Sequence, residues 1–303
     1  MAELSGGRVE SLRRRAYLVE RATDLATIRR WLETRRHYAA YALGQFEPEL
    51  TDLTEWWTAT GDLGRGLVAF ARGGLGDALF CMGEAEAVDA ILRLHQGSRL
   101  TYATYQPEHL TVVRRRYMLQ SPTVMSRMAV RGDTFRPSPP PRNGTLRRLY
   151  ERDVQMLNRL YGTEGGATYY SSSHLREGVY YGMLVDGRLV AAAGTHVVGP
   201  TQGIAVVGNV FTHPAHRGRG FAKATTSAVT AALLERCSDV VLTVDPSNTP
   251  AVEAYRALGY EHVCEIMEGA AARKDPIGLA SFVRRRVAGW RGRKHGGEMV
   301  FAS

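Results

Sequence analysis

Cysteine is scarce in this chain, and its three copies lie far apart. Cys81, Cys237 and Cys264 form no Cys-x-x-Cys pair. An odd number of widely separated thiols favours neither a disulfide framework nor a zinc site. No other cluster of His, Cys, Asp and Glu has the spacing of metal ligands. We therefore expect reduced cysteines, no metal and a cytoplasmic location.

Long apolar runs are also missing. The longest, Leu189–Gly194 and Gly203–Gly208, fall far short of the ~20 residues that cross a bilayer. The segment from Glu3 to Arg15 lacks the apolar core of a signal peptide. We expect no membrane span. The chain has 303 residues, of which 44% are hydrophobic and 23% are charged. This composition is typical of a globular protein. The length favours two domains of about 150 residues each.

The excess positive charge is concentrated near the C-terminus. The formal net charge is +9; residues 141–269 carry twelve basic and twelve acidic residues, and residues 270–303 carry eight against two. This tail contains apolar residues at helical spacing beside Arg284–Arg286: Ile277, Ala280, Val283, Val287 and Trp290. We expect this stripe to pack on its own protein or on a second subunit, which would give a homodimer through the tail. Binding to an anionic membrane or to nucleic acid is the less favoured alternative.

A proline-rich break divides the chain. Residues 136–144 place four prolines in five positions and then an Asn-Gly pair. Consecutive prolines lack backbone donors and hold an extended conformation, so this segment is typical of a linker. We predict a first domain at residues 1–135, a linker at 136–144, a second domain at 145–269 and a tail at 270–303.

The second domain has the clearer pattern of elements. Apolar periodicity and turn residues predict strands at 146–150, 179–185, 189–198, 204–212, 240–244 and 260–267, and helices at 153–161, 221–237 and 249–258. The Asp186-Gly187 pair is a strong hairpin signal. The first domain is weaker but similar, with helices at 25–41 and 108–117 and strands at 66–71, 78–82, 99–105 and 124–130. The fold class is therefore a mixed α/β sheet.

A glycine-rich loop carries the first chemical signal. The predicted strand ends at Thr212, Pro214 stops its ladder, and Gly218 and Gly220 precede a helix. Free amides at a helix N-terminus form an anion site suited to a pyrophosphate. Arg217 and Arg219 would add positive charge at its rim.

A second segment follows about 25 residues later. Asn248 precedes a helix in which Ala251 and Tyr255 share one face, and Gly259 ends that helix. A tyrosine has an ordinary pKa of ~10, so at this position it keeps its proton at neutral pH and can protonate a leaving group. A packed core tyrosine is the structural alternative.

Together the two segments resemble the Gcn5-related N-acetyltransferase (GNAT) family over about residues 145–268. The Arg217-Gly218-x-Gly220-x-Ala222 loop is similar to the acetyl-CoA signature. The resemblance implies that amides of the loop, which also includes Arg219 and Phe221, hold the pyrophosphate. It implies that the main chain of Val210, Phe211 and Thr212 pairs with the pantetheine arm, near Asn248, and that Tyr255 protonates the departing thiolate. The implied fold is a GNAT fold in the second domain and a degenerate GNAT-like first domain, as in tandem members.

The implied function is transfer of an acetyl group, or another short acyl group, from acyl-CoA to a primary amine by direct attack. The acceptor would be a small molecule or a peptide. Two positions depart from the family pattern. Ala215 stands where many members have Gln or Arg, and residues 204–212 contain no glutamate general base, with Asn209 unable to take a proton. His196, His213 and Asp245 are the other candidate bases.

Two alternatives stay open at this point. The missing carboxylate also fits an acyl-CoA-binding sensor or scaffold without turnover. An aminoacyl-tRNA-dependent transferase is the third interpretation, because tandem GNAT-like folds also serve that chemistry and the tail is basic. The glycine loop argues against it.

Overall fold

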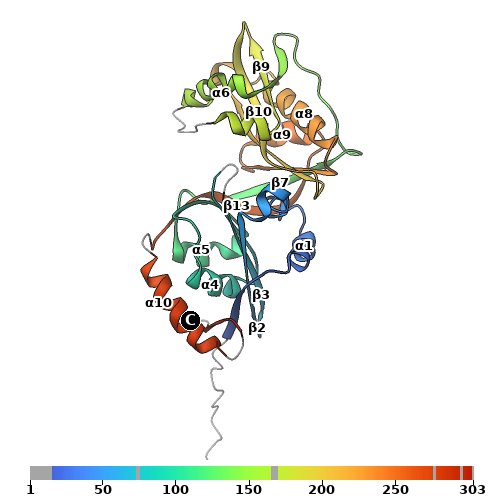
Figure 1. Ribbon diagram of the computed structural model, residues 1–303. Coiled ribbons are helices and arrows are strands. Elements are labelled where there is room, and N and C mark those ends of the chain that lie inside the picture. Colours follow the sequence, from blue (N-terminus) through green and yellow to red (C-terminus); the bar gives the residue numbers. More distant parts are fainter. Residues whose placement is uncertain (1–15, 73–75, 165–169, 276–277, 294–295, 302–303) are drawn as a thin grey trace, which may run out of the picture.

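The computed structural model describes residues 16–72, 76–164, 170–275, 278–293 and 296–301. The chain forms two lobes joined end to end, with strands β7 (Val124–Arg131) and β13 (Glu261–Arg273) between them (Figure 1). No helix in this part of the chain has the length and apolar character that a bilayer crossing needs. The three cysteines are free thiols.

The first half contains a twisted sheet covered by helices on both faces. Its strands besides β7 are β1 (Ala16–Arg21), β2 (Thr54–Gly61), β3 (Gly64–Ala71), β4 (Ala78–Gly83), β5 (Leu100–Tyr105) and β6 (Tyr117–Leu119). Its helices are α1 (Leu25–Glu33), α2 (Ala40–Gly44), α3 (Pro48–Thr51), α4 (Ala85–Leu94) and α5 (Leu110–Arg116). The single helix predicted over residues 25–41 is therefore wrong: α1 ends at Glu33 and a series of turns precedes α2.

The second half follows the predicted order. Its strands are β8 (Thr145–Leu149), β9 (Tyr180–Val185), β10 (Arg188–Gly199), β11 (Ile204–Thr212) and β12 (Asp239–Val244). Its helices are α6 (Val154–Tyr161), α7 (Ser172–Glu177), α8 (Phe221–Leu234) and α9 (Thr249–Ala257). Asp186 and Gly187 both have positive φ, at 48° and 74°, which is the geometry that a two-residue hairpin requires. The predicted hairpin is confirmed.

The two halves repeat one strand order and share one sheet. In each half, four antiparallel strands lead to a parallel pair, β4–β5 in the first and β11–β12 in the second. A helix, α4 or α8, connects the two strands of each pair. The halves then exchange a strand: β7 pairs with β12, β13 pairs with β5, and β7 pairs with β13. The expected mixed sheet is confirmed, and it is continuous across both halves.

This exchange crosses the predicted domain boundaries, which stay predictions. Residues 136–144 contain no helix or strand, and the Ser138 amide donates to Ser227 Oγ at 2.8 Å on α8. Beyond residue 269, β13 continues to Arg273, α10 (Leu279–Gly292) lies beside α4, and β14 (Glu298–Phe301) pairs with β1. The tail therefore returns to the first half.

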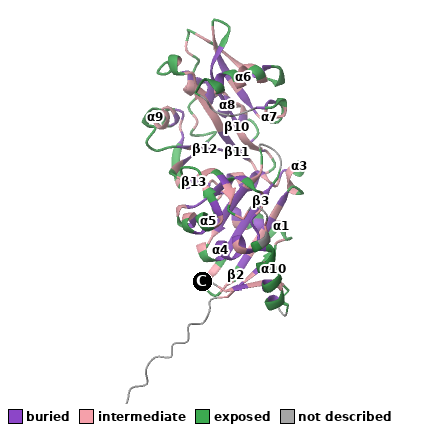
Figure 2. Ribbon diagram, turned by 90° about the vertical axis from the view of Figure 1, so that its left-hand side faces the viewer, coloured by how far each residue is buried: buried purple, intermediate pink, exposed green. Residues whose placement is uncertain are grey.

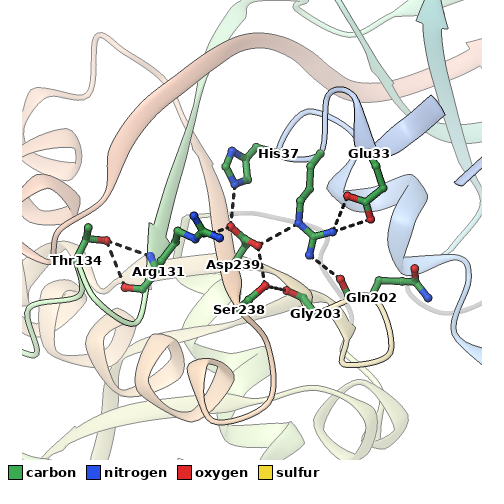
Figure 3. A network of polar contacts seen from close by, with 9 residues as sticks. Glu33, His37, Arg131, Thr134, Gln202, Gly203, Ser238 and Asp239 are labelled. Atoms are coloured by element: carbon green, nitrogen blue, oxygen red, sulfur yellow. Dashed lines mark hydrogen bonds and ion pairs between the residues drawn. The ribbon is translucent and has the colours of Figure 1, made fainter. Parts of the chain in front are cut away.

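A polar cluster ties the halves together around Asp239, the first residue of β12 (Figure 3). Its carboxylate contacts Arg36 Nε at 3.0 Å and His37 Nε2 at 3.0 Å, both from the turns between α1 and α2, and Arg131 Nε at 3.3 Å. Arg36 also donates to the Gln202 carbonyl at 2.6 Å. Burial alone would raise the pKa of Asp239, but hydrogen bonds from His37, Ser238 and Arg36 outweigh it and hold the pKa well below its usual range.

The apolar stripe predicted for the tail does not pack on the rest of the described chain. Val283 is 54% exposed and Trp290 is 68% exposed. Figure 2 shows α10 as mostly exposed. Ser281 and Ala288 are buried instead. A small residue also allows the end of α10 to lie close to the segment before β14: a Cβ on Gly292 would be 1.9 Å from the Gly297 carbonyl oxygen. Ile277 lies outside the described residues.

Candidate active site

The site begins where β11 separates from β12. The parallel pairing joins Ile204–Val207 to Asp239–Leu242 and then stops, although β11 continues to Thr212. Within the described residues, the last five residues of β11 pair with β10 alone. Their other edge therefore carries backbone amides and carbonyls without a strand partner, which an extended ligand can pair with.

A bulge in β11 marks this separation. Gly194 pairs with Gly208 and Ala192 with Phe211, so two residues of β11 lie opposite Ala193. Asn209 in the bulge has φ +53°, a conformation that Asn tolerates better than most residues. Its carbonyl accepts a hydrogen bond from the Tyr161 hydroxyl, and its Nδ2 donates to the Tyr180 hydroxyl at 3.2 Å. Two tyrosines from neighbouring elements thus hold the bulge.

The glycine-rich loop follows β11 directly. His213 Nδ1 accepts from the Ala215 amide at 3.2 Å, and a short 3₁₀ turn spans Pro214–His216. Gly218 and Gly220 have φ of +74° and +77°. A Cβ on Gly218 would meet nothing within 4 Å, so the torsion angle rather than lack of space requires glycine. Phe221, buried at the start of α8, anchors the helix behind the loop.

The loop has the electrostatics of an anion site. The first turn of α8 contains no acidic residue, and the helix dipole gives its N-terminus a partial positive charge. Arg217 lies at the rim, 53% exposed, with its guanidinium 2.6 Å from Glu164 Oε1 and a hydrogen bond to the Thr212 carbonyl. Arg219 contacts the Ala215 carbonyl at 3.4 Å. Both arginines therefore lie at the loop, and their contact with a diphosphate stays a prediction.

Tyr255 of α9 is buried in the apolar cluster against which Val210 of β11 also packs. It is 7% exposed and packs in one apolar cluster with Val210 and Val244. Burial raises the pKa of Tyr255 to about 12, so its hydroxyl stays protonated at neutral pH. Within the part of the chain that the structure describes, this hydroxyl makes no hydrogen bond to another protein group. A donor held in this state is available to a developing anion.

Asn248 and two of the candidate bases have structural partners. Asn248 is exposed and caps α9, with its Oδ1 accepting from the Ala251 amide at 3.3 Å. His213 caps the 3₁₀ turn. Asp245 is exposed and accepts from Ser247 Oγ at 2.7 Å and from the Ser247 amide at 2.8 Å. These hydrogen bonds lower the pKa of Asp245, which makes it a weaker base.

His196 lies on the opposite side of β11. A Cβ on Gly208 would be 2.0 Å from its ring, so the imidazole covers that glycine. Burial lowers the pKa of His196 to about 4, and nearby Arg127 adds to the effect. The ring is therefore neutral at physiological pH. It borders a cavity of about 520 Å³ between the halves, which Asn209 also lines.

The structure adds a buried polar group that the sequence patterns did not indicate. Arg127 of β7 has no exposed surface, and its nearest carboxylate oxygen, Glu268 Oε2, is 3.8 Å away. Its guanidinium carbon lies 4.9 Å from the centre of the Tyr41 ring. Burial raises the pKa of Glu268, while Arg127 and hydrogen bonds from Thr243, Tyr102 and Tyr41 oppose this shift. Isolated Arg and Glu residues on strands give no signal by which this cluster could be found.

The described residues of the first half contain no counterpart of the glycine loop between β4 and α4. A single residue, Glu84, separates β4 from α4, whereas eight residues separate β11 from α8. No chain of successive amides can form there, and a carboxylate occupies the helix start. Among the described residues, no group of three His, Cys, Asp or Glu side chains lies close enough together to hold a metal ion.

Comparison with solved structures gives an acetyltransferase fold. A GNAT-family acetyltransferase from Sphaerobacter thermophilus covers 85% of this chain and 95% of its own, at 17% identity and TM-score 0.52. A Drosophila protein covers 84% and 98%, at 12% identity and TM-score 0.60. A putative GNAT-family acetyltransferase from Novosphingobium aromaticivorans covers 67% and 90%, at 23% identity and TM-score 0.50.

Residues 146–260 match the model of the acetyltransferase (GNAT) family, 115 of the 303 residues of the chain. This segment contains both motifs, so the match confirms the resemblance there. The match supports an acyl-CoA-dependent N-acetyltransferase activity in general. No curated protein sequence matches the chain.

Proposed function

We propose that the second half transfers an acetyl group, or another short acyl group, from acyl-CoA to a primary amine. The observation that carries this proposal is the unpaired edge of β11, which leads directly into the glycine loop. The main chain of Val210, Phe211 and Thr212 would pair with the pantetheine arm. Amides of residues 217–222 would hold the pyrophosphate, with Arg217 and Arg219 at its rim and Asn248 near the pantetheine.

The acyl-CoA supplies the thioester as the second substrate. Attack by the neutral amine nitrogen forms the amide bond and breaks the carbon–sulfur bond. Tyr255 gives its proton to the departing thiolate sulfur. The amine loses one proton to solvent, and the Tyr255 phenolate takes one proton back from solvent before the next turnover. With a pKa of about 12 the Tyr255 hydroxyl holds its proton throughout the neutral range, which a general acid requires, and burial at the same time makes it a weaker acid than an exposed tyrosine.

A sensor or scaffold without turnover is the second candidate. It is favoured by one observation: β11 carries no carboxylate, and Asn209 occupies its bulge. The two candidates differ in one measurement, the release of free CoA thiol from acetyl-CoA in the presence of primary amines. Amine-dependent release, with one acetylated amine formed for each thiol, supports the transferase. Saturable acetyl-CoA binding with no release above the rate without protein supports the sensor and refutes the transferase.

We also propose a homodimer through the tail. The outer face of α10 exposes Phe282, Val283, Val287 and Trp290, and apolar surface of this kind commonly marks an interface. A cytoplasmic location is proposed from the free thiols.

A further inference from the structure

The cavity of about 520 Å³ is built by both halves. Its second-half wall includes His196, Val197 and Asn209, together with Tyr170 and His174. Its first-half wall comes from α2, β3, β4 and β5. Because Asn209 belongs to the bulge of β11, one side of the cavity lies at the position where β11 separates from β12. The volume is within the range of about 300–1,000 Å³ typical of small-molecule sites.

The first-half wall is made chiefly of hydrocarbon. It contains small and apolar residues from α2, β3 and β4: Ala42, Ala69, Ala71, Ala78, Leu79 and Phe80. Tyr41 and Tyr102 add two rings, and burial raises the pKa of both hydroxyls, so both are neutral. Such a wall binds a hydrocarbon or aromatic group by removing it from water.

The charges around the cavity disfavour an anion. Asp77 is the one carboxylate among its described lining residues, and none of those residues is Lys or Arg. Arg127 does not line the cavity; it lies against Tyr41 with Glu268 beside it. A carboxylate entering the cavity would lose its hydration without gaining a cationic partner, which is costly. An ammonium group would meet no Lys or Arg among these residues.

We propose that this cavity is the acceptor site, and that the acceptor is a small primary amine on an uncharged apolar or aromatic body. The proposal rests on the proposed function, because it names the substrate class of the same reaction. The first half then has a direct role: it supplies the wall that selects the body of the acceptor. It takes this role although it lacks a loop for acyl-CoA.

The test compares two amines that differ by one carboxylate. Acetyl transfer is measured with 2-phenylethylamine and with phenylalanine, using the full chain and saturating acetyl-CoA. We expect kcat/KM to be at least about tenfold higher for 2-phenylethylamine, because the cavity offers no cation to the carboxylate. Equal values, or a preference for phenylalanine, would overturn the proposal.

A substitution in the cavity wall tests whether 2-phenylethylamine binds in this cavity. Ala78→Phe narrows the first-half wall, and Ala280→Phe places the same ring on the exposed surface of α10 as a control. We expect Ala78→Phe to raise the KM for 2-phenylethylamine at least about tenfold while the KM for acetyl-CoA changes less than about twofold. Unchanged acceptor KM in a folded Ala78→Phe protein would refute the site. Absence of thiol release with every amine in the wild type would instead refute the proposed function.

Discussion

Asp239 offers the sharpest test of how the two halves are held together. Its carboxylate is 4% exposed and contacts three basic side chains, Arg36, His37 and Arg131, which are 22%, 31% and 62% exposed. Asp239→Asn removes the negative charge and leaves these groups facing a neutral amide. Loss of one partner of a buried ion pair costs about 3–5 kcal/mol. Because Arg131 can turn to water, we expect the low end, about 3 kcal/mol of unfolding free energy.

The assay is urea denaturation followed by two probes. All four tryptophans, at positions 31, 56, 57 and 290, lie in the first half or the tail, so their fluorescence reports on that part alone, while far-UV circular dichroism reports on both halves. The shared sheet predicts that both probes shift together in Asp239→Asn. Asp245→Asn is the control, because Asp245 is exposed and its carboxylate accepts hydrogen bonds from Ser247. We expect a change within about 1 kcal/mol.

The stability difference between wild type and Asp239→Asn should depend on pH in a definite direction. The pKa of Asp239 is lowered in the folded protein, so the stability it contributes is present above the ordinary pKa of 3.8. It is lost as the pH falls from there toward the folded-state pKa. The advantage of wild type over Asp239→Asn should therefore be constant from pH 7 to about 5 and shrink below about 4. A variant as stable as wild type at pH 7 would refute this account of the junction.

Two further predictions concern the loop and the tail. Gly220→Ala places a Cβ on a residue in the left-handed conformation, at φ +77°, which costs ~1–2 kcal/mol. We therefore expect the KM for acetyl-CoA to rise about fivefold to thirtyfold, while Gly132→Ala, the control, leaves it unchanged. Equal KM values in the two variants would show that the loop does not bind acetyl-CoA. Trp290→Glu puts a charge on the exposed face of α10. Sedimentation equilibrium should show a dimer for the wild-type protein and a monomer for the variant. A monomeric wild-type protein would contradict the proposed dimer.

The second half was predictable because its signals are local. The Asp186-Gly187 turn, the apolar runs of β9 and β10, and the glycines before α8 each determine the structure of a few neighbouring residues. The first half gave weaker signals: β1 and β2 were not predicted, and the turns after Glu33 interrupt an apparently continuous helical pattern. The strand exchange of β7 and β13 depends on pairing between residues more than 100 positions apart, which no local pattern encodes.

The same distinction applies to the candidate site. The loop and Tyr255 were found because they lie in short motifs, and the packing of Tyr255 against Val210 follows from the fold. The cavity was not predictable, because α2, β3, β4 and β5 meet β10 and β11 only in three dimensions. Of the two partners predicted for the tail stripe, its own chain is not the one it packs on: Ser281 and Ala288 are buried there instead, since close helix packing favours small residues. Packing of the stripe on a second subunit stays a prediction.

The central claim is that Tyr255 protonates the thiolate in an acetyl transfer catalysed by the second half. The most direct measurement is single-turnover acetyl transfer by Tyr255→Phe, with acetyl-CoA binding measured separately. Tyr260→Phe is the matched control, because Tyr260 lies in the same cluster but its hydroxyl bonds to Thr230 at 2.7 Å. The account predicts a rate loss of about 10²–10⁴ in Tyr255→Phe, with acetyl-CoA affinity within about twofold and the control near wild type. An unchanged rate in Tyr255→Phe would contradict it.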